Sequence, residues 1–153
     1  MAGVTVSRRV LDKISRAIRD VENKREVGGV LLGYRRPHGM DVIDATVPGP
    51  GQFADVVTFT INGEEETAKA AALCEACQEC PEVIGLWHSH VGGIPTFSRQ
   101  DRSSNQMFAH CFGQVLSCIA VPGADHLLKE LVMYQVSPGQ AEQRCHFTGG
   151  APD

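Results

Sequence analysis

The chain has 153 residues, of which 42% are hydrophobic and 21% charged, and these values are typical of one globular domain with a buried core. It has no hydrophobic signal segment at its start and no apolar run near the roughly 20 residues that cross a bilayer, so we expect a cytoplasmic protein rather than a secreted or membrane-bound one. A net charge of −4 without a basic cluster argues against nucleic acid as the main partner and favours a protein surface.

The N-terminal third predicts one helix and two strands. Residues 5–22 carry apolar side chains at helical spacing, namely Val10, Leu11, Ile14, Ala17, Ile18 and Val21. Strands are predicted at 27–35 and 40–47. A turn at 37–39 separates them, and a proline- and glycine-rich loop at 48–51 follows the second.

The remaining elements alternate between strands and helices. In chain order they are a strand at 56–61, a helix at 64–80, a strand at 82–87, a loop at 91–97, a helix at 99–110, and strands at 114–121 and 127–136. This order predicts an α/β fold with one mixed β-sheet and helices on both faces, in a single domain over residues 1–136. Residues 137–153, which end in Gly-Gly-Ala-Pro-Asp, predict a poorly ordered tail.

Three of the six cysteines, Cys74, Cys77 and Cys80, lie three residues apart at the end of the predicted helix 64–80. That spacing places them roughly on one helix face, and unpaired cysteine is commonly buried. We therefore interpret them as packing residues, with an accessory metal site or disulfides as the alternatives.

The strongest functional signal follows the predicted strand at 82–87. His88 and His90 are two residues apart, so on a strand their side chains point to the same face. After a loop, Asp101 lies in the first turn of the next predicted helix, where its carboxylate can reach the same point. Two imidazoles and one carboxylate are a three-ligand set for a catalytic zinc ion with one position open for water, which predicts a hydrolase.

Two further residues gain meaning from this motif. Ser98 precedes Asp101 by three residues, which alone would indicate only a helix start of the capping-box type. Beside His88 and His90, a ligand role for Asp101 is the better interpretation, and Ser98 lies close enough to act at the same point. Glu26 alone would be a solvated carboxylate, but it directly precedes an apolar, glycine-rich strand.

Together these residues resemble the JAMM (MPN+) metalloprotease family. The family pattern is Glu, a long gap, His-x-His, seven residues, Ser, two residues and Asp, and this chain matches every position with Glu26, His88, His90, Ser98 and Asp101. The segment Gly-Leu-Trp-His-Ser-His at 85–90 adds to the likeness, which covers about residues 4–136. The small single-domain chain looks like a prokaryotic stand-alone, deubiquitinase-like member.

The resemblance implies an MPN/JAMM fold with cytidine-deaminase-like layering, and a chemical role for each residue. One zinc ion would be held by His88, His90 and Asp101, and would lower the pKa of its water to about 7. Glu26 would take a proton from that water and pass it to the leaving amine, while Ser98 would donate a hydrogen bond to the oxyanion. The implied substrate is a bond after the C-terminus of ubiquitin or a ubiquitin-like protein.

The departures from the family pattern concern the loop. The family usually has proline directly after the second histidine and just before the serine, where this chain has Val91 and Phe97. Other His-x-His families fit less well, because Gly92 stands where metallo-β-lactamases need aspartate and no Pro-Cys-x-x-Cys of a zinc deaminase follows.

Two alternative functions stay open at this stage. A processing protease for a sulfur-carrier or other small β-grasp protein would use the same chemistry, so these residues do not separate it from a deubiquitinase. An MPN scaffold subunit would lack zinc residues, and the complete set from Glu26 to Asp101 argues against it.

Overall fold

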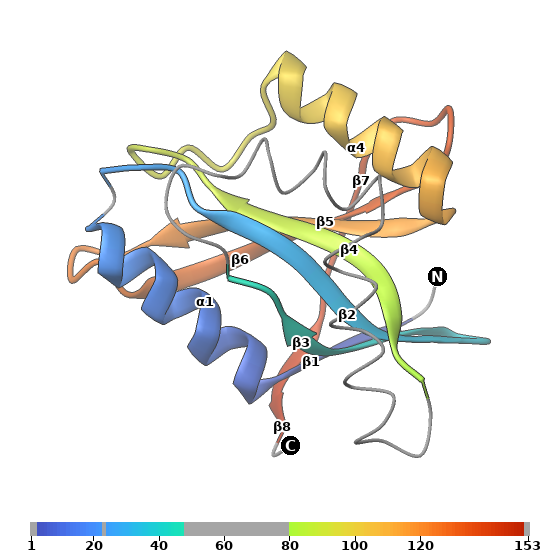
Figure 1. The fold of residues 1–153 in the computed structure, drawn as a ribbon, viewed down its shortest axis with the longest axis horizontal. Coiled ribbons are helices and arrows are strands. Elements are labelled where there is room, and N and C mark those ends of the chain that lie inside the picture. The colour runs from blue at the N-terminus through green and yellow to red at the C-terminus, as the bar shows by residue number, and fades with distance from the viewer. Residues whose placement is uncertain (1–2, 23, 48–79, 152–153) are drawn as a thin grey trace.

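The computed structural model describes residues 3–22, 24–47 and 80–151, and they form one curled eight-stranded sheet with a helix on each face (Figure 1). The strands are β1 Gly3–Ser7, β2 Gly28–Arg36, β3 Gly39–Ala45, β4 Glu82–Ser89, β5 Val115–Pro122, β6 Leu128–Val136, β7 Gln143–Cys145 and β8 Thr148–Ala151, and the helices are α1 Arg8–Val21 and α4 Arg99–Phe112. The predicted α/β fold with a mixed sheet is confirmed. Neither helix described here has the length and apolarity to cross a bilayer.

Each element predicted within the described residues is present, with boundaries that differ by at most three residues. The strand predicted at 56–61, most of the helix predicted at 64–80, and Cys74 and Cys77 lie outside the described residues. Cys80 is disulfide-bonded, which matches the disulfide alternative rather than the interpretation as a free packing cysteine.

The sheet has the strand order β7-β6-β5-β4-β2-β3-β1-β8, so β4 and β2 lie near its centre. These two strands run antiparallel, whereas β4 and β5 run parallel and are joined through α4. A parallel pair needs such a crossover, because the chain must return to the same end of the sheet. The crossover brings the start of α4 next to the end of β4.

Two apolar clusters, one on each face of the sheet, hold the helices in place. In β2, Leu31 packs in the cluster that contains the buried face of α1, while Leu32 packs with Phe108 of α4. In β4, Trp87 belongs to the α1 cluster and Leu86 to the α4 cluster. From Leu86 onward, past the irregularity in the β2–β4 register, this alternation follows from the two-residue period of a strand, so the residue two positions after Leu86 also points toward α4.

Helix α1 forms because its apolar residues recur at helical spacing, and its buried residues are Val10, Ile14, Ala17, Ile18 and Val21. These were the expected positions, except that Leu11 is only half-buried against the same cluster. Glu22 ends the helix in a left-handed conformation with φ 51°, and its N–H donates to the Arg19 carbonyl. This reversal directs the chain toward β2 and places Glu26 just before the strand.

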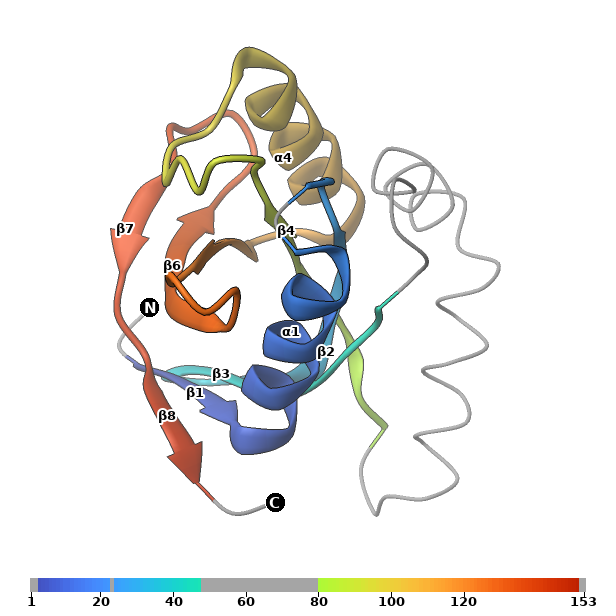
Figure 2. The same cartoon turned by 90° about the vertical axis from the view of Figure 1, so that its left-hand side faces the viewer.

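The structure differs from the prediction for the tail at 137–153. Gln143–Cys145 pairs with β6 as β7, and Thr148–Ala151 pairs with β1 as β8. These strands occupy opposite ends of the sheet order, yet only His146 and Phe147 separate them in the chain. The sheet is therefore curled so that one short segment spans from one edge to the other, and β7 and β8 run end to end in Figure 2. Phe147 packs against the α1 cluster and explains why this segment is held.

Candidate metal centre and its cleft

His88 and His90 stand at the end of β4, on the face that carries α4. Since Trp87 packs toward α1, the strand alternation turns His88 toward α4, and His90 follows two residues later. The side chain of His88 is only 1% exposed, and that of His90 is 12% exposed. The strand thus presents one deeply buried imidazole and one that borders the surface.

Asp101 reaches the same point from the first turn of α4. Ser98 caps this helix, because its Oγ accepts a hydrogen bond from the Asp101 N–H at 3.1 Å. In return, the Ser98 N–H donates to Asp101 Oδ2 at 2.8 Å, which completes a capping box. The predicted capping box is therefore present. It also fixes the direction of the Asp101 carboxylate, which points toward the two histidines.

The three side chains converge on one point. His90 Nε2 lies 2.9 Å from His88 Nε2 and 2.9 Å from Asp101 Oδ2, while His88 Nε2 lies 3.4 Å from Asp101 Oδ2. Among the described residues, this is the one group of three or more histidine, cysteine or acidic side chains close enough to hold a metal ion. The predicted ligand set is thus brought together.

The donor set fits a tetrahedral divalent ion. Nitrogen and oxygen ligands about 2.0–2.1 Å from a zinc ion lie about 3.3 Å from one another, which is within a few tenths of an ångström of the observed separations. His90 Nδ1 lies 2.8 Å from the Ile94 carbonyl oxygen. A carbonyl can only accept, so Nδ1 carries the proton. The lone pair of His90 Nε2 is then free to bind a metal ion together with His88 and Asp101.

The charge state of Asp101 suits a ligand. Its partial burial would by itself raise the pKa of the carboxyl group, but hydrogen bonds with His88 and Ser98 outweigh that effect and hold the pKa well below its usual range. The carboxylate is therefore ionised at neutral pH, as a metal ligand must be.

Glu26 lies at the rim of this centre. It is exposed, and it lines a cleft of about 320 Å³ together with His90, Ser98 and residues of the loop at 91–97. Three of the five predicted site residues therefore border one opening, namely the ligand His90, the proposed base Glu26 and the proposed oxyanion donor Ser98. His88 and Asp101 meet His90 beside it.

The sequence also matches a known family over most of its length. The model of the prokaryotic homologs of the JAB domain matches residues 7–134. The chain belongs to this family. The resemblance to the JAMM (MPN+) proteins is thereby confirmed.

One solved structure supports the same fold. The solution structure of protein DSY2949 from Desulfitobacterium hafniense has a TM-score of 0.67 to this JAB domain at 12% identity, with 98% of this chain and 95% of that chain covered. At this identity the likeness concerns the fold alone. No curated protein matches the sequence.

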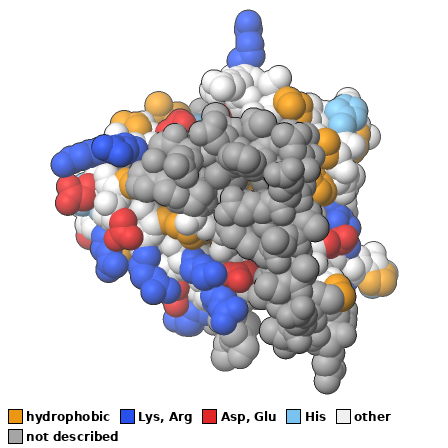
Figure 3. Space-filling model, viewed as in Figure 1, with side chains coloured by type: hydrophobic (Ala, Val, Ile, Leu, Met, Phe, Trp, Pro, Cys, Tyr) orange, Lys and Arg blue, Asp and Glu red, His pale blue; other side chains and the backbone are white. Residues whose placement is uncertain are grey.

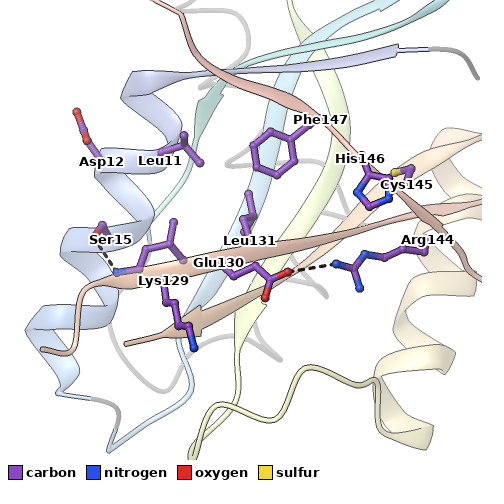
Figure 4. A pocket seen from close by; sticks show the side chains of 11 residues that line it. Leu11, Asp12, Ser15, Lys129, Glu130, Leu131, Arg144, Cys145, His146 and Phe147 are labelled. Atoms are coloured by element: carbon purple, nitrogen blue, oxygen red, sulfur yellow. Dashed lines mark hydrogen bonds and ion pairs between the residues drawn. The ribbon is translucent and has the colours of Figure 1, made fainter. Parts of the chain in front are cut away.

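A larger cavity of about 500 Å³ lies elsewhere on the JAB domain, between α1, β6 and the segment that joins β7 to β8 (Figure 4). Leu11, Phe147 and the Glu130–Arg144 ion pair of 3.2 Å are among the side chains that line it. None of the five predicted site residues lines it. Its size is thus no guide to the chemistry, and the smaller cleft beside Glu26 is the better candidate.

Basic side chains gather over α1 together with acidic ones (Figure 3). We did not expect this gathering from the overall negative charge. Part of this positive charge is neutralised locally, because Lys13 forms an ion pair of 2.6 Å with Asp44 of β3. The expectation that nucleic acid is not the main partner stays a prediction.

Several supporting residues were not expected from the sequence. The ring of Phe97 stacks near His88 with centroids 6.2 Å apart, and it contacts Tyr134 of β6 at 4.8 Å. On α4, Asn105 lies one turn after Asp101 and is buried, and the Ser117 hydroxyl donates to its Oδ1 at 2.7 Å. The Phe97 contacts hold the loop that follows His90, and the Asn105 bond holds the helix that carries Asp101. The spacing of residues in the sequence does not reveal these contacts.

Replacing Ser98 with alanine separates its two roles. If Ser98 donates to the oxyanion, we expect Ser98→Ala to keep its metal and lose about 10²–10³ in turnover. The capping bond predicts in addition a loss of about 1 kcal/mol in the free energy of unfolding. Both roles are compatible, because a hydroxyl that accepts one bond can still donate its proton. Near-normal turnover in a destabilised variant would leave the cap as the whole role.

Proposed function

We propose that this JAB domain is a zinc-dependent peptidase or isopeptidase that cleaves after the C-terminus of ubiquitin or a ubiquitin-like protein. The observation that carries the proposal is the convergence of His88, His90 and Asp101 beside a cleft that His90 lines together with Glu26 and Ser98. The family membership supports a hydrolase, and the substrate class comes from the family resemblance.

The residues suit amide hydrolysis with Glu26 as the proton carrier. When bound by His88, His90 and Asp101, a zinc ion would polarise the substrate carbonyl and acidify the attacking water. Glu26 accepts a proton as the water oxygen adds to the carbonyl carbon. The same carboxyl group then returns the proton to the leaving nitrogen, so the C–N bond breaks to give a carboxylic acid and an amine. Ser98 donates a hydrogen bond to the oxyanion of the tetrahedral intermediate.

The loop at 91–97 is suited to an extended, small-residue substrate segment. Gly92 and Gly93 adopt φ of 86° and 72°, and a side chain on Gly92 would meet open space within 4 Å. Val91 and Ile94, which line the cleft, are 53% and 57% exposed. We propose that the extended C-terminal tail of a ubiquitin-like protein lies against this loop, where apolar contact and close backbone approach select it over other peptides.

The test compares folded fusions with free peptides. The substrates are ubiquitin-like domains that end in small residues and continue into a cargo protein, unstructured peptides with the same junction, and the same domains joined to a lysine side chain. We expect efficient cleavage of the folded substrates and little cleavage of the peptides, because the folded domain contributes binding energy outside the cleft. Glu26→Gln protein prepared in parallel serves as the control for contaminating proteases.

The pattern of cleavage separates the alternatives. Equal cleavage of peptides and folded substrates would remove the ubiquitin-like partner from the proposal and leave a general metallopeptidase. Cleavage of linear fusions without cleavage of lysine-linked substrates would favour precursor processing, as for a sulfur-carrier protein. A metal-loaded protein that cleaves none of them would contradict the enzymatic proposal.

A further inference from the structure

Ser89, between the two histidines, is a buried polar residue that the chemistry above does not use. It is 1% exposed, and its place between His88 and His90 directs its side chain to the opposite face of β4. There it meets the segment that leads into β2. The Val27 N–H donates to Ser89 Oγ at 3.2 Å, and the Ser89 N–H donates to the Val27 carbonyl at 2.8 Å.

These bonds close the ladder between β2 and β4. The regular pairing reaches Gly28 opposite His88, and Val27 opposite Ser89 would be the next pair. Facing residues of an antiparallel ladder alternate between pairs that exchange two main-chain bonds and pairs that exchange none, and the bond from the Ser89 N–H to the Val27 carbonyl marks this pair as one of the first kind. Here the Val27 N–H bonds instead to the serine hydroxyl, which also lies 3.5 Å from the Val27 carbonyl oxygen. A side chain therefore holds the last residue before the strand.

The peptide that Ser89 holds is the one that joins Glu26 to Val27. Glu26 is exposed, whereas Val27 is 2% exposed and belongs to the apolar cluster beneath α1. The Val27 nitrogen is one bond from the Glu26 carbonyl carbon, so its hydrogen bond sets the plane from which the Glu26 side chain departs. A shift of about 1 Å in a reacting group can cost about 10² in rate.

We propose that Ser89 is a positioning residue for Glu26: its hydroxyl orients the Glu26–Val27 peptide so that the carboxylate stays over the cleft. This inference rests on the proposed function, because it gives Glu26 the role of proton carrier. It also accounts for a small hydroxyl-bearing residue between the two histidines, where the metal needs nothing from the side chain.

The experiment uses a matched pair at position 89. Ser89→Thr keeps the hydroxyl. Ser89→Val replaces it with a methyl group in a side chain of nearly the same shape as threonine, so any misfit in the buried site affects both variants. We expect each variant to bind as much zinc as the wild type. Ser89→Val should lose about 10- to 100-fold in kcat with little change in KM, whereas Ser89→Thr should retain most of the activity.

A double-mutant cycle with Glu26→Gln tests whether Ser89 acts through Glu26. We expect Ser89→Val to cause no further loss when Glu26 is already glutamine, because the group that it positions has lost its function. Thr46→Val, at another buried hydroxyl that accepts a main-chain N–H, is the control and should show no such coupling.

The outcomes distinguish this inference from the proposed function. An equal loss from Ser89→Val in both backgrounds, a Ser89→Val enzyme as fast as Ser89→Thr, or a loss of zinc from Ser89→Val alone would each overturn the positioning role. A wild-type protein that is no faster than Glu26→Gln would instead contradict the proposed function, and the positioning role would fall with it.

Discussion

Replacing His88 or His90 with alanine is expected to remove both the bound metal and the hydrolytic activity. The three ligand atoms lie within 3.4 Å of one another, so the loss of one leaves two donors at an otherwise intact site. Loss of a group that merely supports a ligand typically costs 10- to 100-fold in metal affinity or activity, and loss of a ligand should exceed that. Metal content by mass spectrometry and cleavage of a ubiquitin-like fusion measure the two effects on the same samples.

Asp101 needs a gentler change, because it also belongs to the capping box of α4. Asp101→Asn keeps an oxygen that can accept from the Ser98 N–H but loses the negative charge, and we expect it to lose the metal without loss of the helix. His110→Ala, at an exposed position near the end of the same helix, is the matched control and should keep the metal.

A His88 or His90 variant that loses activity but keeps its metal would indicate a different ligand set.

Glu26→Gln is expected to keep the metal and the fold but to lose about 10²–10⁴ in kcat, the usual contribution of a general base. The reason is that glutamine has nearly the shape of glutamate but cannot accept and return a proton. Glu26 borders the cleft and stands outside the group of three ligands, so its effect should appear in turnover alone. Thermal unfolding, metal content and steady-state kinetics of one preparation provide the three measurements.

Glu22→Gln is a suitable control, since Glu22 is an exposed carboxylate four residues earlier at the end of α1. It should turn over substrate like the wild type. Loss of metal from Glu26→Gln would make Glu26 a ligand rather than a base, and full activity would remove it from the reaction.

The candidate metal centre could be predicted because each of its parts follows a local rule. The two-residue period of a strand puts His88 and His90 on one face, and the capping box directs Asp101 toward them. The parallel β4–β5 crossover then brings both parts together, and an alternation of strands and helices already predicts such a crossover. No long-range detail of packing is needed for this part of the fold.

The C-terminal strands could not be predicted in the same way. Gln143–Cys145 is too short for a periodic pattern, and Thr148–Ala151 contains two glycines, which strands usually disfavour. Both are strands because the curled sheet offers unpaired edges near one another, with Phe147 packed between them. The helix predicted at 5–22 includes residues that form β1 in the structure, and the reason is related. Val4 and Val6 alternate over only a few residues before α1 begins, which is too short for a clear strand pattern.

The central claim is that His88, His90 and Asp101 hold one zinc ion, and the most direct test is the metal content of the wild-type protein. The protein would be purified without added metal, and its zinc measured per chain before and after treatment with a chelator. We expect close to one zinc per chain, loss of activity when the chelator removes it, and recovery when zinc is returned. A folded chain that carries no zinc and takes none up when zinc is supplied would contradict the account.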